Sequence, residues 1–252
     1  MGKQMKSKKW WAILGVVSTF VGGSVSVSAA TAGSMDSITD TTFIQDTTTT
    51  SPLDPTNPNT PVGPVDPTNP LDPHEPGTAG PLSINYVSNF HFGSNVITPA
   101  TTTYYAKLDK VKVTSTGNVI DVPNFVQVTD KRGTNAGWKL TVMQNGQFTT
   151  QDGTAKELDN AELSLVAGTP KSLTDTSYAP TTSVATLDPV GGASSDIATA
   201  ADKKGMGTWS IAFGEGAASE TGVSLKVPID TAKVANVQYK TSLTWNLEDT
   251  PN

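Results

Sequence analysis

Two stretches with the same pattern decide the fold: Gly137-Trp-Lys-Leu-Thr-Val142 and, about a hundred residues later, Leu243-Thr-Trp-Asn-Leu247. Residues i and i+2 of a β-strand point to the same face, so Trp138 shares a face with Leu140, and Trp245 shares one with Leu247. The residues between them are polar. Each stretch therefore predicts an amphipathic strand with a tryptophan on its apolar face.

The same kind of pattern runs from residue 82 to the end of the chain. Short runs rich in β-branched and aromatic residues alternate with Gly, Asn, Asp and Pro clusters, and helical periodicity is scarce. Strands are predicted over 82–87, 104–112, 125–129, 137–143, 161–166, 207–213, 222–227 and 237–247. Residues 168–204 are expected to form an insertion or a long connection, with one short strand near 182–187. The fold class is an all-β sandwich or barrel of about eight or more mostly antiparallel strands.

The first 81 residues divide into three segments before the β domain at 82–252. Residues 1–30 have the basic start, apolar stretch and small-residue end of a signal peptide, and the apolar stretch is too short for a membrane span. Residues 31–50 are a Thr/Ser-rich, disordered tip. Residues 51–81 contain ten of the seventeen prolines, so we expect a disordered, extended Pro-rich linker that excludes helix and ladder alike.

Composition excludes several classes of function. The chain has no cysteine, which removes disulfides, thiolate metal sites and cysteine nucleophiles. Its net charge is −6, and it becomes −10 without residues 1–30, which hold four lysines and no acids. Binding to nucleic acid or to anionic lipid rests on basic residues, so neither partner is expected, and no membrane association is expected after signal removal.

No arrangement of residues predicts catalysis, a cofactor or a metal site. His74 lies in the Pro-rich linker and is expected to be solvated, and His91 lies between two phenylalanines. A single histidine in the domain makes neither a zinc site nor a recognisable triad. Gly205 and Gly207 form a weak glycine pair without a phosphate-binding context. The loop acids show no paired spacing for glycan hydrolysis; they are Asp130, Asp152, Glu157, Asp159, Glu162, Glu215 and Asp249.

Two interpretations are open for the motif tryptophans and for the loop before the first motif. Trp138 and Trp245 either offer exposed rings to sugars or, as their alternation with polar residues favours, lie in the core and shape a binding surface. Asp130, Lys131 and Arg132 form either a recognition loop or a solvated hairpin turn with an internal Asp–Arg contact.

The ordered set of motifs resembles the WxL-domain family, the surface domains of low-GC Gram-positive bacteria. The similar blocks are Val126–Gly133 with Gly137–Val142, Gly205–Trp209, Val223–Pro228 and Tyr239–Pro251. The resemblance implies a secreted protein held non-covalently at the cell wall and cell surface. Its implied partners are peptidoglycan or another wall glycan, or a neighbouring WxL-binding surface protein. The implied binding residues are Trp138, Leu140, Trp245 and Leu247.

The sequence therefore predicts a non-enzymatic wall-binding module. It contacts peptidoglycan directly, or it docks on a wall-bound protein, for example by adding to an exposed sheet edge. The alternatives are an adhesin towards host matrix and a cell-wall glycan hydrolase, which would need a converging carboxylate pair or nucleophile.

Overall fold

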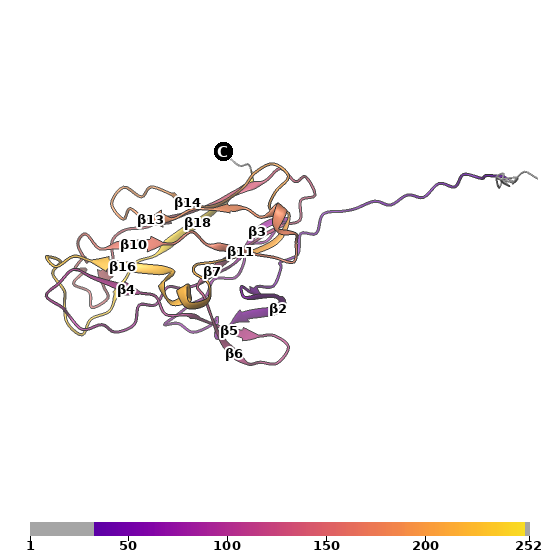
Figure 1. Ribbon diagram of the computed structural model, residues 1–252. Coiled ribbons are helices and arrows are strands. Elements are labelled where there is room, and N and C mark those ends of the chain that lie inside the picture. Colours follow the sequence, from indigo (N-terminus) through magenta and orange to yellow (C-terminus); the bar gives the residue numbers. More distant parts are fainter. Residues whose placement is uncertain (1–32, 250–252) are drawn as a thin grey trace, which may run out of the picture. The chain divides into compact units, whose positions relative to one another are not determined.

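The computed structural model describes residues 33–249 and confirms the all-β class, with 37% strand and 4% helix (Figure 1). The predicted signal peptide lies outside these residues. Residues 33–42 belong to a separate unit without strand or helix, whereas every strand belongs to the unit that begins at Phe43. In the described part of the chain, no helix is long and apolar enough to cross a membrane.

Both motif strands lie in one four-stranded antiparallel sheet. Its order is β12 (Thr181–Thr182), β14 (Ser195–Ala200), β8 (Trp138–Gln144) and β18 (Leu243–Glu248). A second sheet has the order β11 (Thr169–Lys171), β15 (Gly207–Ala212), β7 (Phe125–Asp130) and β3 (Leu82–Val87).

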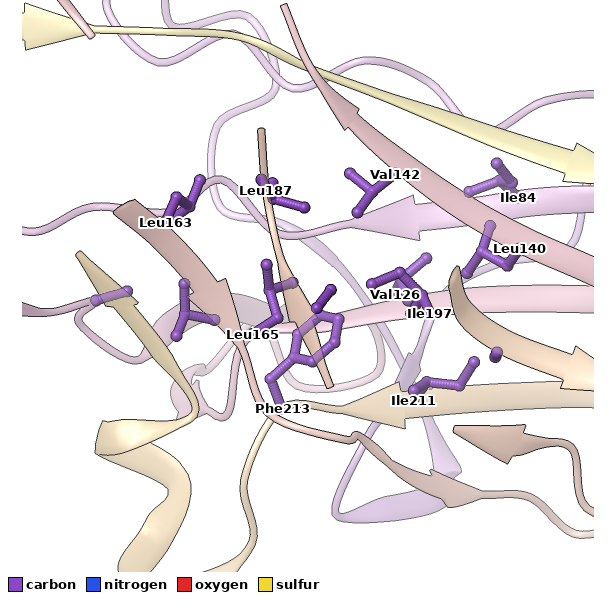
Figure 2. Close-up of a cluster of buried hydrophobic side chains, with 14 of the residues drawn as sticks. Ile84, Val126, Leu140, Val142, Leu163, Leu165, Leu187, Ile197, Ile211 and Phe213 are labelled. Atoms are coloured by element: carbon purple, nitrogen blue, oxygen red, sulfur yellow. The ribbon is translucent and has the colours of Figure 1, made fainter. Parts of the chain in front are cut away.

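The main core lies between these two sheets. Leu140 and Val142 of β8 point into it, as do Val126 of β7 and Ile197 of β14 (Figure 2). A third sheet extends this core, in the order β13 (Ala185–Thr186), β10 (Glu162–Leu165), β16 (Val223–Val227) and β4 (Thr102–Tyr105). The smaller elements are a two-stranded pair, β17 (Tyr239–Lys240) and β9 (Thr149–Thr150), and two short 3-10 helices, Thr176–Tyr178 and Gly216–Thr221.

A fourth sheet covers the other face of β7. Its order is β1 (Leu53–Asp54), β2 (Asn57–Pro64), β5 (Asp109–Val113) and β6 (Val119–Val122). All six residues of β7 are buried because even-numbered residues face the main core and odd-numbered ones face this sheet. The second core cluster contains Val62, Val111, Val122 and Phe125.

The prediction that prolines exclude a ladder throughout 51–81 is wrong for residues 53–64. Strand β2 pairs antiparallel with β1 and β5, and the carbonyls of Pro52 and Pro61 accept hydrogen bonds from the amides of Val62 (2.8 Å) and Thr114 (3.0 Å). Proline lacks only the donor, so a strand whose prolines act as acceptors can still pair. The predicted disorder of residues 31–50 stays a prediction.

Residues 168–204 are also more than an insertion. Strand β14 pairs with the first motif strand along its length, and Ile197, Ala198 and Ala200 are buried. The small residues that suggested a loop are those that fit beside a tryptophan, because Ala200 pairs directly with Trp138. The predicted strand at 104–112 is two strands, since the chain crosses from one sheet to another between β4 and β5.

Candidate functional site

The two Trp-x-Leu motifs, far apart in the sequence, are hydrogen-bonded neighbours. Strands β8 and β18 pair antiparallel, with Leu140 opposite Leu247 and Val142 opposite Trp245. Directly opposed residues share a face of the sheet, so the apolar residues of both motifs form one surface that packs on the main core. The sequence predicted each apolar face but not that the two strands meet.

Trp138 is fully buried, with 0% of its surface exposed, and therefore offers no ring to a ligand. Its Nε1 donates to the carbonyl of Gly205 at 2.9 Å, and Nε1 of the equally buried Trp209 donates to the next carbonyl, that of Met206, also at 2.9 Å. The loop 205–207 is thus held by two indoles. Gly205 and Gly207, the weak glycine pair of the sequence, thus belong to a loop that is fixed by hydrogen bonds from two buried tryptophans.

Gly205 has no room for a side chain. Its φ is +74°, and a Cβ there would lie within 3.0 Å of Trp138 Nε1 and of the Ala200 side chain. The close approach of the loop to the first motif therefore requires glycine at this position.

The second motif is less deeply buried than the first. Trp245 and Leu247 are half-buried, whereas Leu140 is fully buried. The Trp245 ring lies against Phe213, with 6.3 Å between the ring centroids. Of the four residues proposed for binding, only Trp245 and Leu247 thus reach the surface. Whether any of the four binds a ligand stays a prediction.

The loop after β7 ties the ends of the two motif strands together. Arg132 forms an ion pair with Asp130, whose side chain is 2% exposed, and donates to the carbonyls of Gly137 and Asp249. Gly137 precedes β8 and Asp249 follows β18. The hydrogen bond to Asp130 raises the pKa of Arg132. The internal Asp–Arg contact is therefore present, with Asp130 buried and Arg132 partly buried.

Lys131 points to a different part of the chain. Its Nζ contacts the carboxylate of Asp46 and the carbonyl of Thr48, both at 2.8 Å. The hydrogen bond from Lys131 is the largest cause that lowers the pKa of Asp46. This loop consequently anchors residues 46–48 as well as the motif strands.

Strand β18 is an edge strand of its sheet. It pairs with β8 on one side, and no strand within residues 33–249 pairs with its other side. Its side chains alternate between half-buried and exposed from Trp245 onward. The second motif therefore lies on a sheet edge.

Both histidines of the chain line one cleft of about 390 Å³ on another part of the domain. The expectation that His74 is solvated is wrong, because its Nε2 is buried and its ring stacks on that of Tyr86, with 4.4 Å between the ring centroids. His91 lies 3.2 Å from Asp72, and Tyr86 donates to Asp109 at 2.8 Å. Burial, reinforced by Asp109, raises the pKa of Tyr86.

The acidic side chains of the loops contact nearby groups and do not gather at one catalytic site, as Asp152 and Glu215 illustrate. Asp152 accepts from the backbone and hydroxyl of Thr154, which lowers its pKa, and Glu215 pairs with Lys171. Within residues 33–249, no group of three or more His, Asp or Glu residues could hold a metal ion.

The geometry defines an all-β domain whose two tryptophan motifs form one pair of strands. A family model described as the WxL domain, surface cell wall-binding, matches residues 30–251, so the chain belongs to the WxL domain family. It is accordingly a cell-wall-binding protein of the cell surface. No curated protein and no solved structure matches the chain.

Proposed function

We propose that this domain attaches the secreted protein non-covalently to the Gram-positive wall by docking on a wall-bound protein, and that it has no enzymatic activity. The observation that carries the proposal is the direction of the motif side chains. Trp138 and Trp209 are fully buried, and Trp245 is half-buried with its ring against Phe213, so no described tryptophan is a fully exposed platform for sugar stacking.

Net charge supports a protein receptor over adsorption to wall polymers. The chain carries −6, and anionic polymers would repel it. A protein surface can instead supply complementary apolar and backbone groups, which do not depend on net charge.

Direct contact with peptidoglycan is the second candidate, and the histidine cleft is the observation that favours it. Asp72, Asn89, Asp109 and His91 line this cleft and could hydrogen-bond to sugar hydroxyls. An adhesin role and glycan hydrolysis are alternatives of lower rank, because no exposed feature within residues 33–249 points to them specifically.

Co-sedimentation tests the proposal. Purified residues 31–252 are mixed with native, protein-bearing walls and with walls stripped of protein by protease and detergent. Saturable pelleting with native walls and its loss on stripped walls is expected. Equal pelleting with both preparations would overturn the protein receptor and favour direct binding, which Asp72→Asn and His91→Ala variants would then locate.

A further inference from the structure

We propose that the open edge of β18 accepts an extended segment of the wall-bound partner, which adds as a new strand beside the second Trp-x-Leu motif. The inference rests on the proposed function and names the surface and the chemistry of its partner. Strand addition to a sheet edge gives affinity through backbone hydrogen bonds and specificity through alternate side chains.

The orientation of the backbone groups follows from one hydrogen bond and the register. The amide of Asn145 donates to the carbonyl of Ser242 at 3.0 Å. Bonding direction alternates along an antiparallel pair, so residues 244, 246 and 248 also direct their backbone groups to β8. The amides and carbonyls of Leu243, Trp245 and Leu247 therefore point away from β8, to the open edge.

The side chains and the backbone groups of the second motif therefore point to different surroundings. Their side chains pack on the core, while their backbone groups form a row of donors and acceptors at every second residue, about 6.8 Å apart. Within residues 33–249 no strand satisfies this row. A Trp-x-Leu pattern at an edge consequently presents its main chain rather than its tryptophan ring.

Several other edges of the described sheets carry features that block pairing, and the edge strands β4 and β6 have only four residues each. Strand β11 contains Pro170 and Lys171, and β12 and β13 have two residues each. Strand β3 is bulged, and Thr78 bonds to both backbone groups of Ile84. Strand β18 has six residues with neither proline nor lysine, and its pairing with β8 has no bulge. Natural proteins normally protect such an edge.

The occupant fits an extended peptide better than a glycan or a second copy of this chain. Paired amides and carbonyls at a two-residue repeat match another main chain, not sugar hydroxyls. A second copy would bring another net charge of −6, and Asp249 is exposed at the end of the strand. We therefore infer a partner segment with apolar residues at alternate positions and a basic residue beside Asp249.

A matched pair of variants isolates the backbone contact. Leu247→Ala and Leu247→Pro both remove the leucine side chain, but only the proline removes the outward amide. Proline is tolerated where the amide of an edge strand faces solvent, so both variants should fold. With native walls, Leu247→Ala serves as the reference for the proline variant, because it loses the same side chain but keeps the outward amide. Leu247→Pro should lose about tenfold or more in apparent affinity, as for one buried hydrogen bond left unmade.

Amide hydrogen exchange gives an independent readout on the wild-type protein. The amides of Leu243, Trp245 and Leu247 should exchange quickly in the free protein and become protected with native walls, whereas Thr244 and Asn246 should be protected in both. Equal binding by Leu247→Pro and Leu247→Ala, or unchanged exchange at the three motif amides, would overturn the proposal. Should Leu247→Pro fail to fold, Leu243→Pro against Leu243→Ala applies the same comparison.

The two proposals fail in different ways. Pelleting that survives removal of wall proteins contradicts the protein receptor itself. Pelleting that requires wall proteins but is insensitive to Leu247→Pro leaves the receptor in place and rejects only the edge of β18. Dimerisation in solution that Leu247→Pro abolishes would reject the foreign strand in favour of a second copy.

Discussion

Trp138 and Trp245 carry the same motif in different environments, and this difference sets what each residue does. Trp138 is fully buried and hydrogen-bonded to the loop at Gly205, whereas Trp245 is half-buried at the sheet edge. Loss of binding in a Trp138 variant would therefore report on folding before it reports on contact.

Replacing the two tryptophans by alanine should separate their roles. We expect Trp138→Ala to lower the free energy of unfolding by about 3–5 kcal/mol, because it leaves a large cavity and an orphaned carbonyl. Trp245→Ala should cost about 1–3 kcal/mol, since part of its surface is already in water. Urea unfolding followed by circular dichroism measures both, and equal losses would contradict this assignment.

Gly205 and Gly133 provide a matched pair for the loop that the indoles hold. Both have φ of +74°, but a Cβ at Gly133 meets no atom within 4 Å. Gly133→Ala should therefore cost about 1–2 kcal/mol for the left-handed backbone alone. Gly205→Ala should cost about 1–3 kcal/mol more because Trp138 and Ala200 must move. Similar unfolding midpoints for the two variants would show that the loop yields freely.

Tyr86 should make stability depend on alkaline pH. Its pKa in the folded protein is raised above the ordinary value of 10.0, so the folded state holds the phenolic proton more tightly than the unfolded state. Its contribution is fully present below pH 10 and is lost above it, by about 1.4 kcal/mol per pH unit. Urea unfolding of wild type and Tyr86→Phe between pH 8 and 11.5 tests this; parallel profiles would refute it.

At the scale of elements, local pattern predicted the strands but not their neighbours. The alternation in 82–87, 137–143 and 222–227 predicted β3, β8 and β16 almost residue for residue. That β18 pairs with β8 could not be predicted, because the apolar faces of many strands would fit the same core. Strand β14 was missed because Ser195–Ala200 has one large apolar residue and its small ones fit beside Trp138.

The candidate site shows the same limit. The motif residues and the Asp130–Arg132 contact could be read from the chain, since both are local patterns. The bonds from Arg132 to Gly137 and Asp249 span 5 and 117 positions, and only the second requires the complete fold. Likewise, the edge position of β18 is a property of the sheet, so no pattern in 243–248 could reveal it.

Arg132 should stabilise the pairing of strands β8 and β18, because it contacts the start of one and the end of the other. Arg132→Gln leaves the buried Asp130 carboxylate without its cation and releases the end of β18, so we expect a loss of about 3–5 kcal/mol. Lys131→Ala is the adjacent control and should cost less than about 1 kcal/mol, because its partner Asp46 is exposed. Hydrogen exchange at Asn246 and Glu248, whose amides point to β8, should accelerate only in Arg132→Gln. Acceleration in both variants would assign the effect to the loop in general.

At the scale of the molecule, the domain consists of stacked sheets in which β7 is covered on both faces. Gln127 of β7 is fully buried, accepts from the amide of Leu53 at 2.7 Å and donates to the carbonyl of Ser51 at 3.1 Å. Ser210 also donates to it, at 3.1 Å. This buried polar contact holds strands β1 and β2 over the second core cluster.

Truncation distinguishes this architecture from a mobile linker. A chain that begins at Phe43 keeps strands β1 and β2 and should match residues 31–252 in the free energy of unfolding. A chain that begins at Val65 uncovers Phe125 and Val111 and leaves Gln127 without two partners. It should be about 3 kcal/mol or more less stable and should bind the dye ANS. Val62→Ala in the longer chain should give a smaller loss in the same direction. Equal stability of all three chains would mean that residues 43–64 only tether the domain, and that the sheet containing β7 is stable with one face exposed.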